Sequence, residues 1–202
     1  RFDSPELAAH FQHEFDKMFV HGNFGPDTDN GNALDDHPAP KTVRIGTTEV
    51  TTYFSPSRAA QAGAKGALMD ELAKAQKSIQ FLAFSYTDDE IGQLMLNKAQ
   101  SGVKVEGVFE KSQAASRYSE YKTLNAAEAA TPGLDVRIDT NPALMHHKVM
   151  IIDDSTLVMG SFNFSESAHS SNNENMLVIK NAPDLVRAYK EEFARIQNIS
   201  ID

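Results

Sequence analysis

Cysteine and tryptophan are both absent from this chain of 202 residues, and no apolar run is long enough to cross a bilayer. A chain without cysteine forms no disulfide bond, which fits a cytosolic protein and an exported bacterial one equally, so the compartment stays open. The histidines outside the motif described below follow no zinc-ligand spacing; they are His10, His13, His21, His37 and His169. We therefore expect a site without a metal or another cofactor.

Positive charge is also scarce, with 19 basic against 28 acidic residues and a net charge of −9. Residues 1–40 hold two basic and eight acidic residues, so the remainder carries only −3. No basic stripe of the kind that grips duplex nucleic acid is visible, and the acidic balance argues against docking on anionic membranes. A basic surface would require the fold to bring together Lys104, Lys111, Arg117, Lys122 and Arg137.

Strand-like and helix-like segments alternate along the second part of the chain. Strands are expected at 49–54, 78–84, 103–109, 134–138, 149–152, 157–159 and 175–179, and helices at 62–76, 88–100 and 182–196. The helix at 88–100 is expected to open with a capping box from Thr87 to Glu90. The alternation predicts an α/β protein with helices layered on a sheet.

One motif stands out between residues 146 and 163, where the spacing H-x-K-x4-D-x6-G-S-x-N is formed by His146, Lys148, Asp153, Gly160, Ser161 and Asn163. In an extended strand His146 and Lys148 share one face, about 7 Å apart at a rise of ~3.3 Å per residue. That separation suits two groups that touch one phosphate. His147 and Asp153 have the opposite parity, so we expect His147 to be a non-catalytic neighbour.

Each of these residue types suits phosphodiester chemistry. A histidine attacks or protonates, a lysine supplies a fixed positive charge, and a hydroxyl and an amide hold phosphate oxygens. Each residue alone is more often an ordinary surface or turn residue. Their joint spacing is what indicates a site.

The motif resembles that of the phospholipase D superfamily, and the resemblance extends to Glu174 in N-N-E-N. It implies a sandwich built on a mixed β-sheet and a catalytic set of His146, Lys148, Asp153 and Glu174, with phosphate held by Lys148, Ser161 and Asn163. It also implies two-step chemistry without a metal, in which one histidine forms a phosphohistidine and a second protonates the leaving oxygen. By resemblance His146 is the acid, and Glu174 holds its other ring nitrogen. For Asp153, strand parity favours a structural role instead.

The chain carries one motif, whereas this chemistry needs two histidines. Residues 4–18 align without a gap on residues 182–196, which predicts an internal repeat whose first copy is incomplete. The identical pairs are Pro5 and Pro183, Leu7 and Leu185, Glu14 and Glu192, and Phe15 and Phe193. We therefore expect residues 1–21 to be the closing helix of a preceding phospholipase D-like half, 22–42 a linker and 43–202 a half-domain with the motif. Beginning with arginine, the sequence looks like the C-terminal part of a longer protein, and any signal peptide would lie outside it.

Three functions remain open at this point. The motif and its flanking segments look most like the bacterial nuclease-like branch, so a phosphodiesterase acting on nucleic acid is favoured. The alternative is phospholipase D activity on phospholipid head groups, by hydrolysis or transphosphatidylation, and hence lipid degradation. A third possibility is an inactive half-site that needs a partner half, supplied by the missing N-terminal part or by a homodimer mate.

Overall fold

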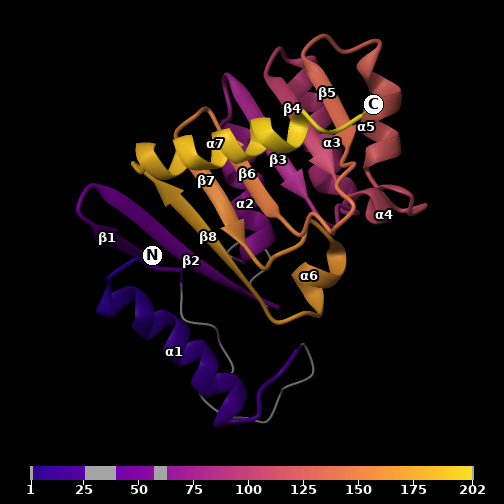
Figure 1. Ribbon diagram of the computed structural model, residues 1–202. Coiled ribbons are helices and arrows are strands. Elements are labelled where there is room, and N and C mark those ends of the chain that lie inside the picture. Colours follow the sequence, from indigo (N-terminus) through magenta and orange to yellow (C-terminus); the bar gives the residue numbers. More distant parts are fainter. Residues whose placement is uncertain (1, 26–39, 57–62, 202) are drawn as a thin grey trace.

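A computed structural model describes residues 2–25, 40–56 and 63–201, and it contains a mixed sheet in the order β1-β2-β8-β7-β6-β3-β4-β5 (Figure 1). The strands are β1 Thr42–Ile45, β2 Thr48–Ser55, β3 Ser78–Ala83, β4 Lys104–Phe109, β5 Leu134–Ile138, β6 Lys148–Ile152, β7 Thr156–Gly160 and β8 Glu174–Lys180. β3, β4 and β5 pair in parallel, and the remaining pairs are antiparallel. This confirms the predicted α/β class and the mixed sheet.

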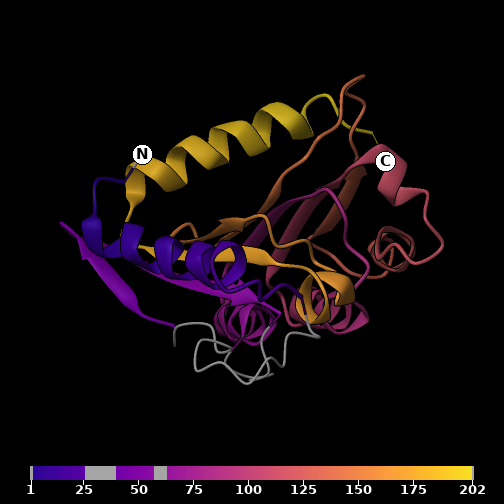
Figure 2. The same cartoon turned by 90° about the horizontal axis from the view of Figure 1, so that it is seen from below.

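The helices cover both faces of the sheet (Figure 2). They are α1 Pro5–Phe19, α2 Ala64–Lys74, α3 Asp89–Gln100, α4 Lys111–Ala114, α5 Tyr121–Glu128, α6 Glu166–Ser170 and α7 Pro183–Gln197. Alternate residues of β6 serve opposite faces: Met150 and Ile152 pack with α2 and α3, while Val149 and Ile151 pack with α7. Buried apolar residues on both parities explain why this strand reads as a continuous apolar run.

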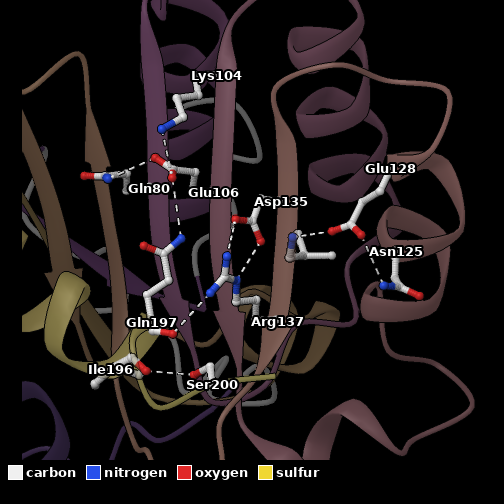
Figure 3. Close-up of polar contacts among 11 residues, drawn as sticks. Gln80, Lys104, Glu106, Asn125, Glu128, Asp135, Arg137, Ile196, Gln197 and Ser200 are labelled. Atoms are coloured by element: carbon white, nitrogen blue, oxygen red, sulfur yellow. Dashed lines mark hydrogen bonds and ion pairs between the residues drawn. The ribbon is translucent and has the colours of Figure 1, made fainter. Parts of the chain in front are cut away.

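Helix α7 crosses the second face, and polar contacts fix its last turn to the parallel strands (Figure 3). The Gln197 amide donates to Glu106 of β4 at 3.4 Å, and the guanidinium of Arg137 on β5 donates to the Gln197 carbonyl at 3.5 Å. Glu106 also pairs with Lys104 at 2.9 Å, and Arg137 with Asp135 at 2.9 Å. The positive charges of Lys104 and Arg137 are therefore each paired with a carboxylate within the fold.

One edge of the sheet collects the ends of six strands. Ala83 at the end of β3 pairs with both Lys148 at the start of β6 and Phe109 at the end of β4. On the other side Gly160 ends β7 opposite Met176, and Ser55 ends β2 opposite Glu174. Ligands of open α/β sheets bind beyond the carboxyl ends of the parallel strands, which is the edge described here.

The predicted elements and the observed ones differ at identifiable places. All seven predicted strands are present, whereas β1 and the helices α4, α5 and α6 were not predicted; β1 begins at Thr42, inside the expected linker. The predicted capping box is wrong, because the carboxylate of Asp88 caps α3 and accepts hydrogen bonds from the N–H groups of Glu90 and Ile91. Helix α2 begins at Ala64; Ala62, the predicted start, and most of the predicted linker lie outside the described residues.

Candidate active site

His146 and Lys148 form the centre of the candidate site. His146 is exposed just before β6, whereas Lys148, the first residue of that strand, is only 7% exposed. The ammonium of Lys148 donates to the backbone carbonyl of His146 at 3.0 Å and lies 4.5 Å from the centre of the Phe84 ring. The same ring packs against the imidazole, with centroids 4.3 Å apart. Phe84 therefore positions both residues, a role that motif spacing did not reveal.

The charge of Lys148 is held in a partly dehydrated environment. Burial lowers the pKa of its ammonium, and the negative charge of Glu174 opposes that shift only partly. A cation that has already lost part of its hydration shell binds an incoming phosphate oxygen without reorganising water. The arrangement therefore suits an anionic ligand.

Gly160 and Ser161, at the end of β7, contact the start of β8. The backbone N–H and the side-chain amide of Asn175 donate to the Ser161 hydroxyl oxygen at 3.0 and 3.2 Å. Because both hydrogen bonds use the oxygen as acceptor, the hydroxyl proton remains available for a phosphate oxygen. Gly160 has φ +150°, and a Cβ there would lie 2.3 Å from the Asn175 carbonyl oxygen. Glycine is thus required for the close approach that orients Ser161.

Asn163 and Glu174 lie at the same edge of the sheet. The Oδ1 atom of Asn163 is buried and accepts no hydrogen bond from any described residue. Phosphate binding by the side-chain amide of Asn163 stays a prediction. Glu174 accepts a hydrogen bond from Asn172 at 3.3 Å. Between Glu174 and His146, within the described residues, there is no hydrogen bond or ion pair. The support of His146 by Glu174 stays a prediction.

Asp153 lies at the far end of β6, away from His146. Its carboxylate accepts hydrogen bonds from the backbone N–H groups of Gln76, Lys77 and Ser78 at 2.9, 2.7 and 3.0 Å. Burial would raise its pKa, but these three hydrogen bonds outweigh burial and lower it. The motif aspartate thus fixes the β6–β7 turn to the start of β3, which agrees with the structural role that strand parity indicated.

His147 faces away from the site. Its Nε2 atom lies 3.6 Å from a carboxylate oxygen of Glu192 on α7, and burial lowers the pKa of its imidazole despite that carboxylate.

Within the described ranges 2–25, 40–56 and 63–201, no cluster of three or more histidine or acidic side chains is arranged to hold a metal ion. No described helix is long and apolar enough to cross a membrane.

Several known proteins resemble this chain in fold and in sequence. Residues 68–197 match the family model described as cardiolipin synthase, PLD-like domain. Nuc from Salmonella typhimurium, a phospholipase D family member of known structure, aligns with a TM-score of 0.68 and 29% identity, covering 77% of this chain and 97% of that one. The chain therefore has a phospholipase D-like fold, and it belongs to the phospholipase D superfamily.

Curated relatives agree with this assignment. A phospholipase D of Rickettsia typhi is 34% identical over 131 residues, which cover 65% of this chain and 60% of the relative. The human mitochondrial cardiolipin hydrolase is 33% identical over 129 residues, covering 64% of this chain and 49% of that protein. The chain thus matches about 60% or less of these two relatives' own lengths.

Proposed function

We propose that the chain is the C-terminal half of a phosphodiesterase that needs no metal ion and proceeds through a phosphohistidine. The convergence of His146, the partly dehydrated Lys148 and the oriented hydroxyl of Ser161 at one sheet edge supports this function. Lys148 and Ser161, with the Asn163 amide, would hold the non-bridging oxygens of the phosphate and stabilise the charge that develops on them.

The reaction needs a second histidine from another half. Its imidazole nitrogen attacks phosphorus and forms a P–N bond, while the P–O bond to the leaving group breaks and that oxygen takes a proton from His146. Neutral His146 then removes a proton from water, whose oxygen attacks phosphorus and breaks the P–N bond. The second step restores both histidines, so no metal or other cofactor enters the balance.

An exposed aromatic and a cation near the same edge favour a nuclease-like substrate. Tyr118, on the segment that follows β4, is 61% exposed, and the guanidinium of Arg117 lies 4.5 Å from its ring centroid. Such a pair stacks on a base and contacts a phosphate. A phospholipid is the second candidate, because Leu144, two residues before His146, is 63% exposed and offers an apolar contact.

The test measures p-nitrophenol release from bis(p-nitrophenyl) phosphate in EDTA, with His146→Ala and the neighbouring His147→Ala as a matched control. Because His147 faces α7, we expect its variant to keep activity within about threefold, whereas loss of His146 removes at least about 100-fold. Release that survives in His146→Ala, or that requires a divalent metal, contradicts the proposal. Comparing single-stranded DNA with phosphatidylcholine as substrates then ranks the two classes, and Tyr118→Ala should impair only DNA cleavage.

If the chain alone is inactive, phosphate binding tests the same site. Inorganic phosphate should shift the NMR signals of the His146 ring, and Lys148→Met should abolish the shift. A wild-type spectrum that phosphate leaves unchanged counts against the proposed site.

A further inference from the structure

A groove of about 500 Å³ lies between helix α1 and the strands β2 and β8. The helix packs on β2 through Phe11, whose ring meets that of Phe54 edge-on with centroids 5.4 Å apart. The Nδ1 atom of His10 also lies 2.8 Å from the hydroxyl oxygen of Thr52. The groove is thus built within one chain, and both α1 and β2 precede residues 68–197, the segment that the family model matches.

The walls of the groove are mainly apolar. Ala8, Phe11, Phe15 and Met18 line it from α1, and Phe54 lines it from β2. Grooves that bind small molecules have volumes of about 300–1,000 Å³ and apolar walls with a few polar groups. The volume and the lining of this groove therefore suit a small ligand with an apolar part.

Asn173 adds one polar group to the lining. Its Oδ1 atom accepts a hydrogen bond from the backbone N–H of Gly25 at 2.9 Å, whereas its Nδ2 atom is buried and has no hydrogen-bond partner among the described residues. A buried N–H group without a partner costs free energy, and a ligand that brings an acceptor oxygen removes that cost. The groove therefore favours an apolar ligand that also carries an oxygen.

The charges of the groove decide between an apolar chain and a nucleic acid strand. Its acidic lining residues are Glu14, which pairs with Lys17 at 3.1 Å, and Glu174. Among the described residues that line the groove there is no lysine or arginine. Nucleic acid binding depends on basic side chains that neutralise phosphates, whereas a hydrocarbon chain needs only apolar walls.

Two residues of the groove also belong to the candidate active site. Glu174 is one of them, and the other is Asn175, whose backbone and side-chain amides donate to the Ser161 hydroxyl at 3.0 and 3.2 Å. A ligand that reaches Asn175 is therefore next to the hydroxyl group that is proposed to hold phosphate.

We propose that this groove binds the apolar chain of an amphiphilic phosphodiester, while the phosphate of the same molecule lies at Lys148 and Ser161. An oxygen near the start of the chain accepts a hydrogen bond from Asn173. The inference rests on the proposed function for the position of the phosphate, and it gives the second of the two substrate classes a binding site for its chain. Helix α1 is then part of the substrate site.

The test measures how affinity depends on the length of the chain. The ligands are octyl-, decyl- and dodecylphosphocholine, which are single-chain phosphodiesters, and glycerophosphocholine, which has the same head group without an apolar chain. Titration calorimetry with each ligand below its micelle-forming concentration gives the Kd, for the full chain and for His146→Ala, in which turnover does not interfere. The NMR signal of the Asn173 side-chain amide reports on the groove itself.

Two substitutions in α1 locate the binding. Phe15 lines the groove and is 50% exposed, whereas Phe19 is 75% exposed and is not among the lining residues. Phe15→Asp and its matched control Phe19→Asp therefore make the same change on the same helix, inside and outside the groove. Thermal unfolding checks that both variants are folded.

We expect the Kd to fall by up to about fourfold for each methylene group that the groove buries. Phe15→Asp should raise the Kd of dodecylphosphocholine at least about tenfold, and Phe19→Asp should change it less than about twofold. The Asn173 amide signal should shift with dodecylphosphocholine and stay in place with glycerophosphocholine.

A Kd that does not depend on chain length overturns the proposal, as does an equal effect of the two aspartate substitutions. An Asn173 signal that dodecylphosphocholine leaves unchanged also overturns it, even if Phe15→Asp does not fold. None of these readouts needs turnover. Chain binding without phosphodiesterase activity therefore leaves this site standing when the proposed function fails, and activity without chain binding removes this site alone.

Discussion

Glu120 is a buried carboxyl group whose ionisation should weaken the fold. It is 6% exposed at the start of α5. Its carboxyl group packs so closely on Gly92 that a Cβ added to Gly92 would lie 2.1 Å from a carboxyl oxygen of Glu120. Burial, the negative charge of Asp89, a side-chain hydrogen bond with Asp89 and the charge of Asp88 raise its pKa from 4.5 to about 7. The folded state therefore binds the proton more tightly than the unfolded chain does.

The sign and the size of the effect follow from linkage. A pKa raised in the folded state gives stability that is complete below pH 4.5 and is lost as the pH rises to about 7. The rise of the pKa from 4.5 to about 7, at 1.36 kcal/mol for each tenfold change in proton affinity, corresponds to about 3 kcal/mol at pH 8. Glu120→Gln, which has nearly the same shape and no charge, should therefore stabilise the protein by up to about 3 kcal/mol at pH 8 and by little at pH 4.5.

Urea unfolding at a series of pH values between 4.5 and 8 measures this difference, with the exposed Glu191→Gln as control. The difference in the free energy of unfolding between Glu120→Gln and the parent should grow as the pH rises. The free energy of unfolding of Glu191→Gln should follow that of the parent at every pH. The reasoning is refuted if Glu120→Gln is less stable than the parent at pH 8, or if the difference does not vary with pH.

Three further substitutions test the site and its support. Gly160→Ala should destabilise the fold by about 2–4 kcal/mol in urea unfolding, because the new methyl group would collide with the Asn175 carbonyl; a loss below about 0.5 kcal/mol would show that the two segments separate easily. Asp153→Asn should lose about 2 kcal/mol at pH 7, since an amide oxygen accepts the hydrogen bonds from Ser78 and its neighbours less strongly than a carboxylate. That difference should shrink as the pH falls through 3.8, the ordinary pKa of the carboxyl group, and a constant difference would contradict its electrostatic origin. Lys148→Met should lower phosphodiesterase turnover at least about 100-fold while leaving the unfolding midpoint unchanged or higher, because it removes a partly dehydrated charge; turnover close to that of the parent would exclude Lys148 from phosphate binding.

Sequence periodicity predicted the sheet and the direction of the motif side chains well. The alternation at β6 placed Lys148 opposite His147, and the structure has Lys148 at the site edge and His147 against α7. Elements with weak patterns were not predicted. Strand β1 has only four residues, and α5 is short and rich in alanine, so neither shows enough periodicity to stand out from a loop.

The contacts across the site were harder to predict, because they depend on which strand ends meet. Phe84 lies more than 60 positions before His146 in the sequence, and only the β3–β6 pairing brings its ring against the imidazole. Asn175 was visible in the N-N-E-N segment, yet its hydrogen bonds to Ser161 follow from the β7–β8 register. The capping error at α3 had a local cause, since Thr87 and Asp88 are adjacent and either side chain suits an N-cap.

β6, β7 and β8 are neighbours both in the sheet and along the chain. As a result the side chains that the proposal assigns to the reaction in this half, from His146 to Glu174, and the asparagine that orients Ser161 fall within thirty consecutive residues. A site assembled from one short stretch forms through contacts that are local in sequence, which favours rapid folding. It is also copied whole by any duplication that spans that stretch. Duplication of this one segment would therefore supply the second histidine together with the residues that support it.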